Sequence, residues 1–201
     1  GWESHETVRE APALAVIDGH GANGVVAMRR VVDIAVDKAR RTTFGAVGLS
    51  NVTHIGRVGD FPPRIAERDM IGMVWTNVGG IFTAPFGGVD RRMRPNPISF
   101  AVPRRDGPPF MLDMTLSAVA GGKVEQKLAR DEPIPEGWLI DDQGRHVTDG
   151  NRFGDPDPDV AMLPLGGLQF GHKGHGLSMM MEMIVGPLSL AGCTTGENQG
   201  G

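Results

Sequence analysis

The chain has very little cysteine, and this limits its chemistry. Its single cysteine, Cys193, cannot form an internal disulfide, and a cysteine-rich zinc site is excluded as well. One free cysteine is typical of a reducing compartment, and no basic and apolar leader opens the chain. We therefore expect a cytoplasmic protein.

Long apolar runs and an excess of one charge are also absent. The most apolar stretch, residues 176–192, is interrupted by Glu182 and is shorter than the ~20 residues that cross a bilayer. The 20 Lys and Arg against 24 Asp and Glu give a net charge of −4 without long runs of one sign. Binding to a phosphate backbone or an anionic membrane needs clustered Lys and Arg. We therefore expect a soluble protein with neither a nucleic acid nor a membrane as partner.

What the chain does contain is apolar material and many turn residues. It has 201 residues, of which 40% are hydrophobic, and this is enough for a sizeable core. Its 30 glycines and 15 prolines indicate tight turns between short elements. An all-helical bundle is hard to reconcile with this composition.

Strands and helices alternate along the sequence. Short apolar runs and residues that alternate in polarity predict strands, and apolar positions three and four apart predict helices. The predicted strands are residues 13–18, 45–50, 70–76, 98–102, 110–115 and 138–140, and the predicted helices or helical turns are 25–41, 61–69, 117–130 and 174–185. This order indicates an α/β or α+β class. A weak shift in composition near Thr76 marks the best candidate for a domain boundary.

The two ends suggest an incomplete protein. The first residue is Gly1 rather than Met, and residues 192–201 are polar and rich in glycine. We expect the chain to be a piece of a longer protein.

A glycine motif, Gly19-His-Gly21-Ala-Asn-Gly24, matches G-x-G-x-x-G between a predicted strand and a predicted helix. That fingerprint also needs an acidic residue about 20 positions further on, to bind a ribose hydroxyl. Residues 49–53 contain no acid. We therefore interpret the motif as a tight turn into a helix capped by Asn23 rather than as a dinucleotide site.

The segment after the second strand carries a candidate catalytic pair. His54 and Arg57 are three residues apart and would share a face if the chain turns helically there. Histidine exchanges protons near neutral pH, and arginine offers a planar fork for a carboxylate. The pair therefore describes a general acid/base beside a carboxylate-binding group. A purely structural His and Arg pair is the alternative.

Two further segments could contact a cofactor. Asp113, Thr115 and Ser117 lie at a predicted helix start, where they could cap the helix or help to bind an anion. Lys173 lies among glycines just before a Met-rich helix, where a cation could meet a cofactor phosphate. His172 and His175 are an alternative as metal ligands, but no Cys or carboxylate joins them at ligand spacing, so we predict no metal.

Taken in order, the motifs of this chain resemble the malate/L-lactate dehydrogenase family of the second, non-Rossmann kind. Ureidoglycolate, sulfolactate, 2-oxo acid and cyclic imino acid oxidoreductases belong to this family. The resemblance rests on a series of segments that covers nearly the whole chain: Asn51-Val-Thr-His54-Ile-Gly-Arg57-Val-Gly59, Ala84-Pro-Phe-Gly-Gly88, Asn96-Pro97, Asp113-Met-Thr-Leu-Ser117, Gly122-Lys-Val124, Ile134-Pro-Glu-Gly-Trp138, Leu163-Pro-Leu-Gly-Gly167 and Gly171-His-Lys-Gly174. Each motif alone is weak, whereas the series is specific.

The resemblance implies an NAD(P)-dependent oxidoreductase that moves a hydride between a nicotinamide cofactor, NAD or NADP, and C2 of a 2-hydroxy or 2-oxo acid. His54 falls on the catalytic histidine, and Arg57 would lie close to the substrate carboxylate. The cofactor-contacting positions would be Val78, Leu112, Asp113, Met114 and Lys173.

The resemblance also implies a non-Rossmann fold with a mixed sheet, here truncated at both ends, and a homodimer. Residues 1–74 would belong to a substrate and dimer domain, residues 75–172 to a cofactor domain, and residues 173–201 would return to the first domain. The chain departs from the family at two places: Val52 replaces a common serine, and Arg94-Pro95 replaces Gly-Thr before Asn96. The second change leaves the choice of cofactor open.

Two alternatives remain at this point. The chain could reduce the C=N bond of a cyclic imino acid with the same proton from His54. It could also be a non-catalytic fragment whose apolar surfaces serve dimer packing.

Overall fold

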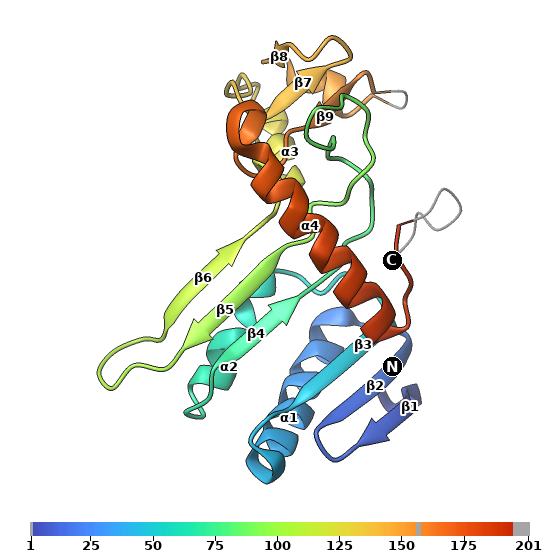
Figure 1. Cartoon of the computed structure of the whole chain (residues 1–201), viewed down its shortest axis with the longest axis vertical. Helices are drawn as coiled ribbons and strands as arrows, with labels where there is room; N and C mark the ends of the chain where they lie inside the picture. The colour runs from blue at the N-terminus through green and yellow to red at the C-terminus, as the bar shows by residue number, and fades with distance from the viewer. Residues whose placement is uncertain (1, 156–157, 195–201) are drawn as a thin grey trace.

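The computed structural model describes residues 2–155 and 158–194, and it contains helices and three small sheets (Figure 1). The expectation of a mixed α/β class is confirmed in this coarse form. None of the helices in the described ranges is long and apolar enough to cross a membrane. Residues 195–201 of the predicted polar tail lie outside the described residues.

Sheet A is formed by the N-terminal part of the chain, after a short 3-10 helix, η1 (Trp2–Ser4). Its strand order is β1-β2-β3, with β1 antiparallel and β3 parallel to β2. Helix α1 connects β2 to β3, and its apolar face, which includes Val32, is buried. The bounds are β1 (Glu6–Ala11), β2 (Leu14–Ala22), α1 (Gly24–Thr42) and β3 (Ala46–Val52).

Sheet B is an antiparallel meander of β4, β5 and β6. The short helix α2 contacts β4 and β5, and the 3-10 turn η2 precedes it. The bounds are η2 (Val58–Asp60), α2 (Pro62–Ala66), β4 (Gly72–Trp75), β5 (Ile98–Val102) and β6 (Phe110–Met114). The predicted domain boundary at residue 74/75 falls within β4, and the division into domains stays a prediction.

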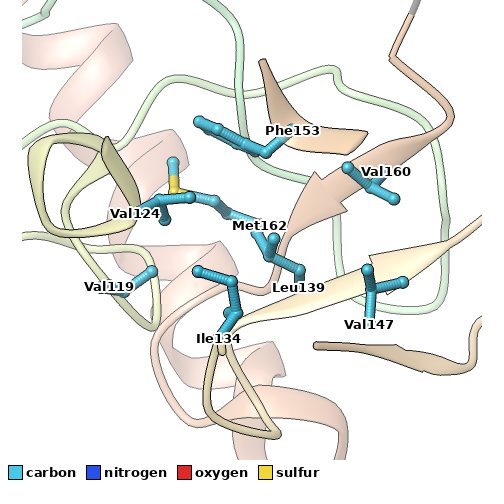
Figure 2. Close-up of a cluster of buried hydrophobic side chains, with 8 residues drawn as sticks. All are labelled: Val119, Val124, Ile134, Leu139, Val147, Phe153, Val160 and Met162. Carbon is cyan, nitrogen blue, oxygen red and sulfur yellow. The ribbon is translucent and has the colours of Figure 1, made fainter. Parts of the chain in front are cut away.

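Sheet C is antiparallel, has the order β8-β7-β9 and lies against a buried apolar cluster. Eight buried apolar side chains meet between this sheet, α3 and η3 (Figure 2). Leu139, Met162 and Val124 have no exposed surface at all. The bounds are α3 (Gly121–Ala129), β7 (Leu139–Asp141), β8 (His146–Val147), η3 (Gly150–Phe153) and β9 (Val160–Met162). We call these elements together the sheet C region.

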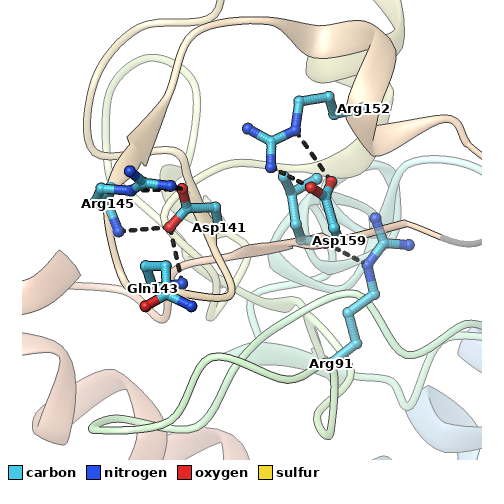
Figure 3. Close-up of polar contacts among 7 residues, drawn as sticks. Arg91, Asp141, Gln143, Arg145, Arg152 and Asp159 are labelled. Atoms are coloured by element: carbon cyan, nitrogen blue, oxygen red, sulfur yellow. Dashed lines mark hydrogen bonds and ion pairs between the residues drawn. The ribbon is translucent and has the colours of Figure 1, made fainter.

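Charged contacts hold the loops of the sheet C region (Figure 3). The carboxylate of Asp141 accepts hydrogen bonds from the backbone N–H groups of Gln143 and Arg145 and from the Arg145 Nε, at 2.9–3.0 Å. The backbone N–H of Arg145 is the main cause that holds the pKa of Asp141 below its usual range. Arg152 pairs with Asp159, and Arg91 donates to the backbone oxygens of Val160 and Phe153. These bonds close the turns around β7 and β9.

The long helix α4 (Gly167–Ser189) runs from the sheet C region past sheet B to sheet A (Figure 1). Its Met181 packs with Ile98 and Leu116 in a small core. The predicted start at residue 174 is wrong, because the helix begins seven residues earlier. A Cβ on Gly174 would lie under 3.0 Å from Leu165. Close packing therefore places glycine in a helix despite its low helix propensity.

Two other predictions of elements need correction. The helix predicted at 117–130 begins only at Gly121, because residues 115–120 form hydrogen bonds to neighbouring loops instead. Strands β1, β8 and β9 are not predicted by the sequence pattern, since β1 is exposed along nearly its whole length and β8 and β9 are only two and three residues long.

Candidate active site

The loop after β3 carries His54 and Arg57, and three hydrogen bonds fix its start. Asn51 Nδ2 donates to Asp18 Oδ1 over 3.0 Å, and the backbone N–H of Thr53 donates to the Ala22 oxygen over 3.0 Å. The backbone N–H of Gly24 donates to Thr53 Oγ1 over 3.1 Å. A hydrogen bond from the backbone N–H of His20 lowers the pKa of Asp18, so this carboxylate stays ionised as an anchor. The loop therefore has a fixed position against the β2–α1 connection.

The glycine motif at residues 19–24 supports this loop. Strand β2 continues through Ala22, and Asn23 caps α1 by accepting a hydrogen bond from the backbone N–H of Val26 over 3.1 Å, as predicted. A Cβ on Gly24 would lie under 3.0 Å from the backbone of Thr53 and His54. Glycine at this position thus allows the start of α1 to lie directly against the catalytic candidate.

His54 is exposed, and one of its two ring nitrogens has a partner. The backbone N–H of Gly56 donates to His54 Nδ1 over 3.0 Å. Because Nδ1 accepts a hydrogen bond, the neutral ring carries its proton on Nε2. In this tautomer Nε2 is a hydrogen-bond donor for a ligand oxygen, and it accepts a proton only when the Gly56 N–H bond is released and Nδ1 carries the ring proton.

Arg57 does not share a helical face with His54, so that expectation is wrong. Residues 54–57 are not helical, and Arg57 has the extended dihedral angles φ −77° and ψ 122°. Its Nε donates to Asp113 Oδ2 over 2.9 Å, and its Nη1 lies 3.8 Å from Asp60 Oδ1. A Cβ on Gly59 would lie under 3.0 Å from that Asp113 carboxylate. Two distant segments, η2 and β6, therefore meet to orient this guanidinium.

The three candidates on β6 lie on two faces of sheet B, because side chains alternate along a strand. Asp113 contacts Arg57 on one face, whereas Met114 packs on the other against the Met181 cluster. Leu112 is 44% exposed. The predicted helix start at Thr115 and Ser117 is wrong, since Thr115 Oγ1 donates to the Pro95 oxygen over 3.0 Å and α3 begins at residue 121.

Lys173 lies inside α4 rather than in a loop before it. It is exposed, and its Nζ lies 5.9 Å from the centre of the Phe170 ring. The described residues show no contact between Lys173 and His54, Arg57 or Asp113. His175 Nδ1 accepts a hydrogen bond from the Phe86 backbone N–H, so this ring has a structural partner. Within the described ranges, no group of three or more Asp, Glu, His or Cys could hold a metal ion.

The segment around Val78 fits a ligand with hydrogen-bonding groups. Val78 is half-buried and follows Trp75 and Asn77. The Nε1 of Trp75 and the Oδ1 of Asn77 are buried and have no partner among the described residues. A buried polar atom without a partner can be satisfied by a hydrogen-bonding group of a ligand. Sequence reasoning missed Trp75 and Asn77, because burial without a partner is visible only in three dimensions.

A pocket of about 350 Å³ opens beside Arg57, and we call it the arginine pocket. Apolar side chains from α1, from β6 and from the segment between β3 and α2 form much of its wall, including Val25, Ile55, Phe61 and Met111. Its cations are Arg29 from α1, Arg57, and Arg64 from α2. His54 does not line the pocket, but the three residues that follow it do. Sequence reasoning did not single out Arg29 or Arg64, because their shared pocket depends on how α1 meets α2.

Comparisons with known proteins show what this chain is similar to. A profile of the malate/L-lactate dehydrogenase family matches residues 3–200. A malate dehydrogenase of Pyrococcus abyssi is 40% identical over 188 residues, which are 90% of this chain and 50% of that protein. A Delta(1)-pyrroline-2-carboxylate/Delta(1)-piperideine-2-carboxylate reductase of Pseudomonas aeruginosa is 34% identical over 89% of this chain and 51% of that protein.

A solved structure is also similar to this chain. The sulfolactate dehydrogenase of Methanocaldococcus jannaschii superposes with a TM-score of 0.76 at 34% identity, over 90% of this chain and 50% of that one. The chain thus spans about half the length of the relatives that it matches.

Proposed function

This chain belongs to the malate/L-lactate dehydrogenase family, and from that premise we propose that it carries the proton-transfer site of an NAD(P)-dependent oxidoreductase. The reaction moves a hydride between the nicotinamide cofactor and C2 of a 2-hydroxy or 2-oxo acid. The family resemblance that the motif series indicates is confirmed. The residue roles, the substrate and the homodimer are parts of the proposal.

The observation that carries the proposal is the state of His54. Its ring is exposed, and the Gly56 backbone N–H occupies Nδ1 at 3.0 Å, so the second ring nitrogen is available to a ligand. Arg57 lies three residues further on, with its guanidinium oriented by Asp113. A proton-exchanging ring beside an oriented cation is the pair that a 2-hydroxy acid requires.

In the oxidation direction, the ring gives up the Gly56 N–H bond and carries its proton on Nδ1, so that Nε2 takes the proton of the C2 hydroxyl. In reduction, the doubly protonated ring returns that proton from Nε2 to the oxygen. Arg57 pairs with the carboxylate next to C2 and so fixes the orientation of the carbon that reacts. The Asp113 carboxylate holds the Arg57 Nε at 2.9 Å and Asp60 lies 3.8 Å from Nη1, which leaves Nη2 for the substrate. The nicotinamide cofactor, when bound, supplies or accepts the hydride.

Cofactor binding is assigned to Val78, Leu112, Asp113, Met114 and Lys173. The unpartnered polar atoms of Trp75 and Asn77 next to Val78 support this assignment. Because Asp113 and Met114 lie on opposite faces of sheet B, we assign Asp113 a role through Arg57 as well. No residue is assigned to distinguish NAD from NADP.

Replacing His54 by asparagine tests the proposal. The asparagine oxygen can still accept the Gly56 N–H, but it cannot exchange a proton, so we expect turnover to fall at least ~100-fold with little change in cofactor affinity. The measurement is NADH or NADPH oxidation with oxaloacetate and pyruvate, using the protein that carries this chain. The matched control is His146→Asn, because His146 Nδ1 also accepts a backbone N–H, from Gly137 at 3.2 Å, but in the sheet C region. Turnover of His54→Asn within ten-fold of the control contradicts the role of His54.

A second reaction on the same site is reduction of a C=N bond. The 34% identity to a pyrroline- and piperideine-carboxylate reductase favours it as the alternative. Both reactions need one proton and one carboxylate partner, so His54 and Arg57 keep their roles. A cyclic imino acid assayed beside the two 2-oxo acids separates the two reactions.

A further inference from the structure

One residue of α4, Glu182, contacts three separate segments of the chain. Its Oε2 accepts a hydrogen bond from Asn96 Nδ2 over 2.7 Å, and its backbone oxygen accepts one from Asn77 Nδ2 over 3.4 Å. Its Oε1 accepts two bonds from Thr194, one from the backbone N–H and one from the hydroxyl, both over 2.6 Å. Glu182 therefore joins α4 to the segment that leaves β4, to the segment that enters β5 and to the chain that follows α4.

The segments after β4 and before β5 lie side by side. The backbone N–H of Thr76 donates to the Pro97 oxygen over 3.3 Å, in continuation of the antiparallel register of β4 and β5. The next position along brings Asn77 beside Asn96. Val78, a proposed cofactor position, directly follows Asn77. The contacts of α4 with this end of the strand pair therefore lie one residue away from a cofactor position.

The segment before β5 is also bonded to the end of β6. The Pro95 oxygen accepts hydrogen bonds from the Leu116 N–H over 2.8 Å and from Thr115 Oγ1 over 3.0 Å. Both donors directly follow Met114, another proposed cofactor position. A shift of the segment that carries Asn96 would therefore move the end of β6 as well.

The chemistry of Glu182 fixes how both carboxamides are turned. A carboxylate and a backbone carbonyl only accept hydrogen bonds, so Asn77 and Asn96 must present their Nδ2 groups to Glu182. Their Oδ1 atoms are buried and have no partner among the described residues. An amide in place of the carboxylate would remove this constraint, because an amide also donates. Glu182 thus determines both the place and the orientation of two buried amides.

We propose that Glu182 is a positioning residue for the nicotinamide cofactor. Through Asn77 and Asn96 it holds the cofactor-contacting segments at Val78 and Met114 in place, without a contact of its own to the cofactor. The hydrogen bonds from Thr194 keep the carboxylate in the orientation that Asn96 requires. This inference rests on the proposed function, because the cofactor positions do.

Glu182→Gln tests the proposal. The glutamine oxygen can still accept from Thr194, but its NH₂ group then faces the NH₂ group of Asn96, and two donors cannot bond. We expect the Kd of NADH or NADPH, whichever the original protein binds more tightly, to rise about 10-fold in a fluorescence titration, because the cofactor segments lose their fixed place.

Steady-state kinetics with oxaloacetate separates positioning from a loss of folded protein. For Glu182→Gln we expect KM for the cofactor to rise about 10-fold and kcat to change less than about 2-fold. A substitution that only unfolds part of the sample lowers the active fraction, so kcat falls while KM stays the same. If Glu182→Gln does not fold, Glu182→Asp replaces it with the same expectation, because its shorter side chain cannot reach Asn96 and Thr194 together.

An exchange of the two groups is the rescue. In the double variant Glu182→Gln/Asn96→Asp, the glutamine NH₂ donates to the aspartate, so a donor and an acceptor face each other again at the same net charge. We expect the cofactor affinity to return to within about 3-fold of the original. The control is Thr194→Val, which removes the hydroxyl bond to Oε1 and keeps the backbone bond, and which should leave the cofactor affinity unchanged.

Hydrogen exchange measures the positioning itself, in protein without cofactor. The amides of Thr76 and Leu116 are bonded to the Pro97 and Pro95 oxygens. Both amides should exchange faster in Glu182→Gln than in the original protein, and at the original rate in Thr194→Val. Unchanged exchange in Glu182→Gln overturns the positioning role.

The outcomes distinguish this inference from the proposed function. A protein that turns over 2-oxo acids, and whose Glu182→Gln variant keeps the original Kd and KM for the cofactor, retains the oxidoreductase and overturns the role of Glu182. A lowered kcat at unchanged KM, or a double variant that binds no more tightly than Glu182→Gln, also overturns this role. A protein that binds neither NADH nor NADPH contradicts the proposed function, and the cofactor role of Glu182 is then overturned whatever the exchange rates are.

Discussion

The sheet C region and the arginine pocket differ in what they bury. In the sheet C region, Leu139, Ala161 and Met162 are fully buried and their neighbours are apolar. Around the pocket, His54, Arg29 and Arg64 are exposed, and the Arg57 side chain is 60% exposed. The sheet C cluster thus consists of packed apolar side chains, whereas the surroundings of the pocket expose several charged groups to a ligand. A substitution in the sheet C region should therefore lower the stability of the fold without changing ligand affinity, and a substitution of an exposed charged residue at the pocket should do the reverse.

The largest effect is expected from Leu139→Ala in the sheet C region. The substitution leaves a cavity in a fully packed cluster, so the free energy of unfolding should fall by about 2–5 kcal/mol. Urea denaturation measures it. Malate affinity of the variant should remain unchanged at a temperature where it is folded. The control is Ile71→Ala, since Ile71 is 61% exposed and its loss should cost less than about 0.5 kcal/mol. Equal destabilisation by the two variants contradicts the comparison.

Gly59→Ala acts at the pocket and should have the next largest effect. The added methyl group would collide with the Asp113 carboxylate and push it away from Arg57. We expect a loss of about 1–3 kcal/mol of stability from overpacking, together with weaker binding of lactate, because the Arg57 guanidinium loses its orientation. Unfolding curves and calorimetry measure the two effects. Unchanged lactate affinity in the folded variant argues against Asp113 as the residue that positions Arg57.

Asn23→Ala removes the cap of α1, which lies next to the His54 loop. Losing the hydrogen bond to the Val26 N–H should cost about 1 kcal/mol. Thermal unfolding measures this loss, and Asn23→Asp should restore most of the stability because aspartate caps as well as asparagine does. An alanine variant as stable as the original chain contradicts the assignment of the cap.

The smallest effect is expected when the pH is lowered and the stability of the sheet C region is followed. The pKa of Asp141 is lowered mainly by the Arg145 backbone N–H, so its contribution to stability is present above the unfolded-state pKa of about 3.9. That contribution is lost as the pH falls through the lower pKa of the folded state. Urea midpoints between pH 6 and pH 2 should therefore depend less on pH in Asp141→Asn. Asp142→Asn, at an exposed neighbouring position, is the control and should keep the original pH dependence.

Part of this structure could be predicted from local sequence patterns. The apolar stripe of residues 25–41 predicts α1 within one residue at each end, and the alternation at residues 98–102 predicts β5 with its observed bounds. The Asn23 cap predicted at residues 19–24 is confirmed, whereas the predicted tight turn is wrong, because residues 19–22 continue strand β2.

The rest depends on contacts between distant segments. Arg57 and Asp113 are 56 positions apart, and nothing local to either shows that they meet. The pocket shared by Arg29 and Arg64 depends on the angle between α1 and α2. The start of α4 is missed because its glycines have low helix propensity, which packing against residue 165 overrides. The sequence thus names His54, Arg57 and Asp113 as candidates, but it does not show that Arg57 and Asp113 are bonded to each other.

Isotope transfer tests the central role of His54 most directly. The protein that carries this chain is incubated with oxaloacetate and with reduced nicotinamide cofactor that carries deuterium at both C4 positions, and the hydroxy acid formed is analysed by mass spectrometry. The account predicts deuterium at C2 of the product, formed at least ~100-fold more slowly by His54→Asn and at an unchanged rate by His146→Asn. A product without deuterium at C2, or an equal rate in the two variants, contradicts it.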